Sequence, residues 1–163
     1  AIAEQAEKDR VAEDRIDPML PGCIDQRLFL AHAAIESTRT LGVKGIITDS
    51  ETGQTARALA SFRGPVPVLA ICYKEKTQRW LNLSYGVIPI YQREQIHNQQ
   101  MFLAALRMLR QKGYIELDDK IAYLSGSFGE GGGTTFVEIN KVKDVFDKSY
   151  QFHLPDSECK IEE

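Results

Sequence analysis

Residues 48–57, TDSETGQTAR, form the stretch whose residue types and spacing best suit chemistry with an anion. A glycine and three hydroxyl residues lie between an expected strand and an expected helix: Ser50, Thr52, Gly53 and Thr55. A helix N-terminus offers unpaired backbone N–H groups and the positive end of its dipole, which suits a phosphate. Plain N-capping by serine or threonine accounts for the same residues. The pattern alone leaves both interpretations open.

A second stretch, residues 125–139 (SGSFGEGGGTTFVEI), holds four glycines within five residues: Gly129, Gly131, Gly132 and Gly133. It leads from one expected strand into another, so it is not a dinucleotide-binding fingerprint, which leads into a helix. A simple hairpin connection and a phosphate-binding loop both fit it. Because both glycine-bearing loops follow the carboxyl ends of strands, where open α/β sheets bind ligands, they could form one pocket.

Other catalytic candidates are few. Asp49 and Glu51 could be proposed as paired carboxylates, but no nucleophile or base stands at a readable spacing from them. The three cysteines form no CxxC and the three histidines are isolated, so we expect idle thiols in a reducing cytoplasm and no metal site. We expect Trp80 and Tyr85 to pack against the sheet rather than to stack on a ligand.

These candidate residues are positioned by an alternation of short apolar strands and helices. The pattern predicts helices at residues 1–15, 25–41, 55–63, 74–83 and 93–113, and strands at residues 44–48, 66–73, 86–91, 119–126 and 134–142. Helical crossovers imply a mainly parallel sheet, whereas the last connection has room only for an antiparallel hairpin. The sequence therefore predicts a three-layer α/β/α sandwich of about five strands with one antiparallel edge strand.

Bulk composition restricts the classes of partner. The chain has 163 residues, 43% hydrophobic and 26% charged, with a net charge of −3 and a pI near 5.7. No basic face for nucleic acid is expected, and no apolar run approaches the roughly 18 residues of a membrane span. The first ten residues lack the basic start and apolar centre of a signal peptide, so we expect a cytoplasmic protein.

Four stretches together resemble the C-terminal domain of pyruvate kinase, over roughly residues 28–140. They are AHAAIESTRTLGVKGIITDSETGQTARALASFRGPVPVLAI, TQRWLNLSYGVIPI, LRQKGYIELDDKIAYLSGS and GGGTTFVEI. The opening IAEQAE looks like the end of the helix that closes the catalytic barrel in that family. The resemblance implies a helical stub at 1–16, the α/β domain at 17–142 and a partly disordered tail at 143–163.

The resemblance implies an enzyme that transfers a phosphoryl group from phosphoenolpyruvate to ADP, with Mg²⁺ and K⁺, while this piece alone is inactive. It implies a domain that contacts its own catalytic barrel, joins subunits into a tetramer and binds a sugar-phosphate effector. The effector's phosphate would contact Ser50, Thr52, Gly53, Gln54 and Thr55. A second loop, including Ser127, Gly131, Gly132, Gly133 and Thr134, would close over the other end.

Two departures from the family concern the effector. Glu51 stands where tight binders of fructose 1,6-bisphosphate have a basic or neutral residue, and a carboxylate there repels phosphate. Ser127, Phe128 and Glu130 stand where such forms offer tryptophan and arginine. We therefore expect a monophosphate such as AMP or ribose 5-phosphate, or no effector. The alternative is a free-standing α/β phosphate-ligand-binding module without enzymatic activity.

Overall fold

The structure, a computed structural model, describes residue 5 and residues 25–92, 98–126 and 133–151. Five strands form one sheet in the order β3-β2-β1-β4-β5. They are β1 (Gly45–Ser50), β2 (Val68–Cys72), β3 (Val87–Tyr91), β4 (Lys120–Ser125) and β5 (Phe136–Lys141). The first four are parallel and β5 is antiparallel to β4. The predicted sheet with one antiparallel edge strand is thus confirmed.

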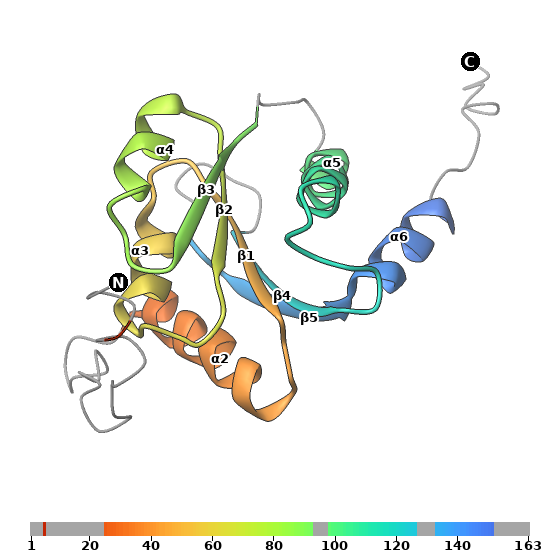
Figure 1. Ribbon diagram of the computed structural model, residues 1–163, viewed down its shortest axis with the longest axis horizontal. Coiled ribbons are helices and arrows are strands. Elements are labelled where there is room, and N and C mark those ends of the chain that lie inside the picture. Colours follow the sequence, from red (N-terminus) through yellow and green to blue (C-terminus); the bar gives the residue numbers. More distant parts are fainter. Residues whose placement is uncertain (1–4, 6–24, 93–97, 127–132, 152–163) are drawn as a thin grey trace, which may run out of the picture.

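Helices cover both faces of this sheet (Figure 1). On one side lie α2 (Gln26–Thr40), α3 (Gln54–Ser61) and α4 (Glu75–Leu81), and on the other α5 (Asn98–Gln111) and α6 (Val142–Gln151). The Asp25 side chain caps α2 by accepting from the Leu28 N–H at 2.7 Å. Gly42 follows that helix with a φ of 69°, in the left-handed region that glycine adopts readily, as expected for its C-terminal stop.

The face under α2 and α3 combines three buried alanines with larger apolar side chains. Ala31, Ala34 and Ala122 are fully buried there and contact Ile46 of the central strand and Leu59 of α3. Small side chains let a helix approach the sheet closely. This close packing fixes α3, and therefore the start of α3, against the end of β1.

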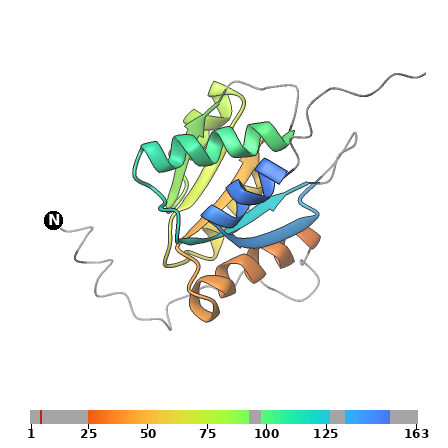
Figure 2. The same ribbon diagram turned by 90° about the vertical axis from the view of Figure 1, so that its right-hand side faces the viewer.

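Helices α5 and α6 face the viewer in Figure 2. The space beneath them is filled mainly by large aliphatic side chains. Leu106 and Leu109 of α5 pack on Ile47 and Ile121 of the sheet. Helix α6 follows β5 without a loop, and its Val142 N–H donates to the Asp119 carbonyl at 3.0 Å. The expected tail therefore begins as a packed helix.

Several expected elements lie outside the described residues. The expected helix at 1–15 is one of them, except for residue 5. The start of the expected helix at 93–113 and the end of the tail, from residue 152, are the others named here. Within the described part, no helix combines the length and apolar character that crossing a membrane requires.

Candidate anion-binding site

The turn between β1 and α3 is built on Gly53. Its φ of 82° lies in the left-handed region, and a Cβ there would come within 3.2 Å of the Leu81 side chain. Both the backbone conformation and the close contact therefore favour glycine. The Gly53 N–H donates to the Ser50 hydroxyl oxygen at 2.9 Å, which closes the turn. Ser50, which is 4% exposed, is thus a structural partner of this turn.

Helix α3 begins at Gln54 without a side-chain cap. The N-cap position is Gly53, and no side chain accepts a hydrogen bond there from the first turn. The capping by serine or threonine that we weighed at this helix is therefore wrong in this structure. Gln54 instead accepts a hydrogen bond from Arg27 of α2 at 2.6 Å. Amides of the first helical turn, together with the helix dipole, can receive an anion here.

A single hydrogen bond joins the two glycine-bearing loops. The hydroxyl oxygens of Thr55 and Thr134 lie 2.6 Å apart, although the residues are 79 positions apart in sequence. The contact is possible because β1 and β4 are parallel neighbours, with Thr48 beside Leu124, so their carboxyl ends share one edge. Thr134 is 6% exposed, and the Thr135 N–H next to it donates to the Ser125 carbonyl at 2.9 Å.

The remaining predicted residues divide into described and undescribed ones. Thr52 and Gln54 are exposed at the turn, and Gly133 is exposed with open space around its Cβ position. The structure thus brings Ser50, Thr52, Gly53, Gln54, Thr55 and Thr134 to one edge of the sheet. Ser127, Gly131 and Gly132 lie outside the described residues.

The turn is also tied to α4 through Glu51. The Lys74 ammonium pairs with the Glu51 carboxylate, and the Thr77 hydroxyl donates to the Glu51 carbonyl at 2.7 Å. Both charged side chains are more than half exposed, so the pair contributes at most about 1 kcal/mol to stability. Its electrostatic effect is local: the cation offsets the negative charge that we expected to repel a phosphate.

Asp49 lies apart from Glu51. Side chains alternate along a strand, so Asp49 shares the face of Ile47, beneath α5, whereas Glu51 is exposed beside Lys74. Burial raises the pKa of the Asp49 carboxyl, and a hydrogen bond with Ser125 partly opposes that rise. Burial and the charge of Asp49 together raise the pKa of Tyr123. The two carboxylates therefore do not form a pair.

A groove of about 400 Å³ lies between the start of α3 and α4. Its lining includes Thr52, Arg57, Lys76, Thr77, Trp80 and Leu81.

Our expectation that Trp80 packs against the sheet is wrong, because its side chain is 64% exposed at this groove. Tyr85 is 40% exposed and lies under the Arg63 guanidinium, 5.1 Å from the ring centre. The spacing Lys76–Trp80, one helical turn, is the sequence signal that could have identified this surface.

Metal ligands do not gather in the described part of the chain. No group of three or more histidine, cysteine, aspartate or glutamate side chains is placed there to hold an ion. Burial raises the pKa of the Cys72 thiol to about 11, which keeps it protonated and unreactive at neutral pH.

The family model of the pyruvate kinase α/β domain matches residues 29–140, which is more than half of the chain. The chain belongs to the pyruvate kinase family. It is similar to pyruvate kinase of Borreliella burgdorferi, with 31% identity over 89% of this chain and 31% of that protein. Pyruvate kinase of Lactobacillus delbrueckii is 27% identical over 68% of this chain and 19% of that protein.

Solved structures agree with this assignment. Pyruvate kinase of Cryptosporidium parvum, determined in complex with ADP, matches with a TM-score of 0.68 and 25% identity, over 76% of this chain and 25% of that chain. The chain spans less than a third of the length of the curated relatives named above. It is the C-terminal α/β domain of a pyruvate kinase, and α6 begins just after the matched region ends at residue 140.

Proposed function

We propose that this domain binds a monophosphate effector at the two joined loops and regulates a complete pyruvate kinase. The hydrogen bond between Thr55 and Thr134 carries the proposal, because it makes one site from two loops that are far apart in sequence. A ligand that contacts both loops would couple the end of β1 to the β4–β5 connection. Such coupling is what an effector site requires.

Three features of the site favour an anion. The first turn of α3 has no side-chain cap, so its amides remain available to a ligand. The second feature is the dipole of α3, which stabilises an anion near the start of the helix by about 0.3–1 kcal/mol when exposed and up to about 2 kcal/mol when partly buried. The third feature is Lys74, which offsets the charge of Glu51 beside the turn.

The charge at this site supports a small ligand with one phosphate. Around the turn, Lys74 is already paired with Glu51, Arg27 is paired with Asp25 while it donates to Gln54, and the hydroxyl groups of Thr52 and Thr55 are neutral. Neutral donors can hold one phosphate group, whereas a bisphosphate needs a further cation at its other end. AMP and ribose 5-phosphate meet this condition better than fructose 1,6-bisphosphate does.

Our proposal extends to the whole protein. Its relatives are pyruvate kinases, which supports a cytoplasmic phosphotransferase acting on phosphoenolpyruvate and ADP with Mg²⁺ and K⁺. In it, this domain would contact the catalytic barrel and join subunits into a tetramer. The matched region is the α/β domain alone, so the 163-residue chain should show no phosphoryl transfer. A coupled assay for pyruvate would detect any activity.

Ribose 5-phosphate tests the effector site because it carries one phosphate and no aromatic ring. At a ligand concentration about tenfold above Kd, linkage gives about 1.4 kcal/mol, a rise in melting temperature of roughly 3–6 °C. Thr55→Asp should abolish this rise, since its charge opposes the phosphate but suits the start of α3.

Gln111→Asp is the matched control. It adds the same charge at the end of α5, on the opposite face of the sheet, and should leave the ligand-induced rise unchanged. No rise with millimolar ribose 5-phosphate, or an equal rise in the Thr55→Asp variant, would rule out the proposed site.

A further inference from the structure

The groove between α3 and α4 is separate from the junction of the two loops. Neither Thr55 nor Thr134 belongs to its lining, and only Thr52 connects it with the turn. Its volume of about 400 Å³ lies within the range of about 300–1,000 Å³ that small-molecule sites occupy. Its lining combines apolar side chains, Leu81 and Leu83 among them, with charged and hydroxyl side chains.

Two cations face this groove from different helices. Arg57 belongs to the second turn of α3 and Lys76 to the first turn of α4. In the part of the chain that the structure describes, no carboxylate pairs with either side chain, and none lines the groove. The nearby Glu51 is already paired with Lys74. The groove therefore carries uncompensated positive charge.

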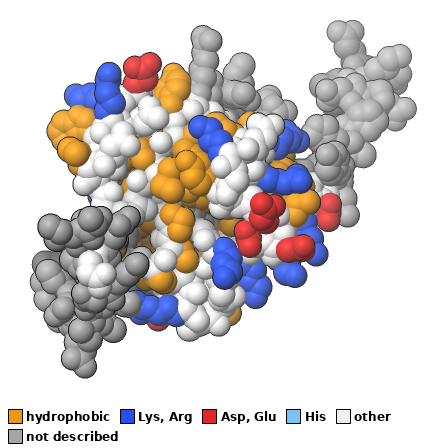
Figure 3. All heavy atoms as spheres, viewed as in Figure 1, with side chains coloured by type: hydrophobic (Ala, Val, Ile, Leu, Met, Phe, Trp, Pro, Cys, Tyr) orange, Lys and Arg blue, Asp and Glu red, His pale blue; other side chains and the backbone are white. Residues whose placement is uncertain are grey.

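Trp80 provides a flat apolar surface beside these charges. It follows Lys76 by four residues, so both side chains lie on the same face of α4. Its indole is 64% exposed, and basic and hydrophobic side chains lie next to each other at the α4 end of the molecule (Figure 3). Indole rings stack well on nucleobases, and each stacked base contributes roughly 1–3 kcal/mol.

We propose that this groove binds a nucleoside monophosphate, with the base on Trp80 and the phosphate between Arg57 and Lys76. A phosphate monoester carries a charge of about −1.5 to −2 at neutral pH, which two cations balance. A carboxylate carries a single negative charge and would leave one of the two cations unbalanced. The site is additional to the effector site at the loops and does not depend on it.

Trp80 is the only tryptophan in the chain, so its fluorescence reports directly on the groove. AMP should quench this fluorescence. Adenosine, which lacks the phosphate, should bind at least about tenfold more weakly, because charge-assisted hydrogen bonds are lost. Ribose 5-phosphate, which lacks the base, should leave the emission unchanged even where it raises the melting temperature.

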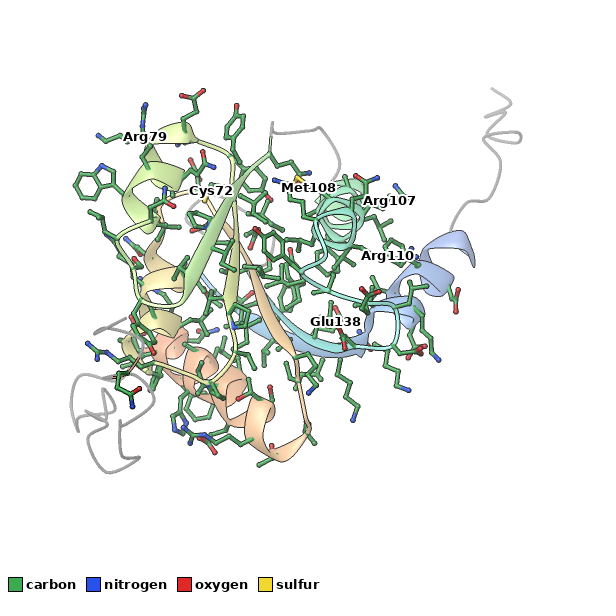
Figure 4. The ribbon with its side chains drawn as sticks, viewed as in Figure 1. Cys72, Arg79, Arg107, Met108, Arg110 and Glu138 are labelled. Atoms are coloured by element: carbon green, nitrogen blue, oxygen red, sulfur yellow. The ribbon has the colours of Figure 1, made fainter. Side chains whose placement is uncertain are left out.

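Variants separate the two sites. Lys76→Ala and Arg57→Ala should each raise the Kd for AMP about tenfold by removing one phosphate contact. Arg79→Ala is the matched control, because Arg79 is an exposed cation on the same helix that does not line the groove (Figure 4). Thr55→Asp should leave quenching by AMP unchanged. All four positions are exposed or half-exposed, and unchanged circular dichroism would confirm folding.

Four results would overturn this assignment. The first three are no quenching and no calorimetric heat with millimolar AMP, an unchanged Kd in both groove variants, and a loss of quenching in Thr55→Asp alone. A blue shift of Trp80 emission that grows with protein concentration, without ligand, would assign the groove to a protein partner and also contradict the proposal. The thermal shift with ribose 5-phosphate is a separate measurement, and it alone decides the proposed effector site.

Discussion

The two faces of this sheet are packed in different ways. Beneath α2 the contacts are made by Ala31, Ala34 and Ala122, and a Cβ added at Gly64 would come within 2.6 Å of the Ile35 side chain. Beneath α5 the space is filled mainly by Leu and Ile side chains, with one fully buried alanine, Ala105. At these positions the first face therefore holds small groups in close contact, while the second depends mainly on the volume of large ones. Loss of side-chain volume should therefore destabilise the protein most beneath α5, and gain of side-chain volume should destabilise it beneath α2.

The same division continues to the carboxyl end of β1, where the candidate site lies. Successive residues there point to opposite faces, so the hydroxyl groups of Thr48 and Ser50 share the α3 face and the carboxyl group of Asp49 shares the α5 face. The neutral hydroxyl groups thus lie on the α3 face, where the candidate anion site is. The half-buried acid lies on the other side, away from the proposed effector.

The largest effect is expected from removing volume beneath α5. Leu106 is fully buried, and Leu106→Ala should lower the free energy of unfolding by about 3 kcal/mol, because it loses apolar burial and leaves a cavity. Urea denaturation would measure this change. Leu83→Ala, at a side chain that is 92% exposed, is the control and should change stability little. Equal losses in both variants would contradict the packing described for this face.

Beneath α2 the damaging change is an increase in volume. Ala34 is fully buried between α2 and the sheet, and Ala34→Leu should lower the free energy of unfolding by about 1–3 kcal/mol through overpacking. Ala104→Leu adds the same atoms at a half-buried position of α5 and should have a much smaller effect. If the two variants lose the same stability, the loss in Ala34→Leu does not come from overpacking beneath α2.

The architecture could be predicted because its signals are local. Apolar runs such as residues 66–73 separated by amphipathic helices indicate a parallel sheet, and the short last connection indicates a hairpin. The adjacency of the two loops followed from the same reasoning, since β1 and β4 had only to be neighbours. The family resemblance was likewise visible in the sequence, and the comparisons confirm it.

The details of the site depend on contacts between distant elements, which local patterns do not contain. Lys74 pairs with Glu51 only because α4 lies beside the turn. Trp80 was placed against the sheet on its hydrophobic character, yet the inner face of that short helix is occupied by Leu81, which is 1% exposed. The packed start of the tail had a weak signal, Val142, Val145 and Phe146 at helical spacing, within an otherwise polar segment.

The smallest predicted effect concerns Asp49 and its dependence on pH. Burial raises the pKa of its carboxyl in the folded state above the usual 3.8, so the folded protein holds this proton more tightly than the unfolded chain does. The carboxyl's contribution to the free energy of unfolding should therefore fall as the pH rises from about 3.8 through the raised pKa.

Asp49→Asn removes this titration and should raise stability at neutral pH while changing it little below pH 3.8. Urea denaturation across this pH range would measure the difference, with Glu116→Gln at an exposed position as the control. In that control, the free energy of unfolding should change with pH as it does in the unchanged protein. If the free energy of unfolding of Asp49→Asn also changes with pH in that way, then Asp49 is not desolvated beneath α5. The contrast between the two faces then does not extend to the end of β1.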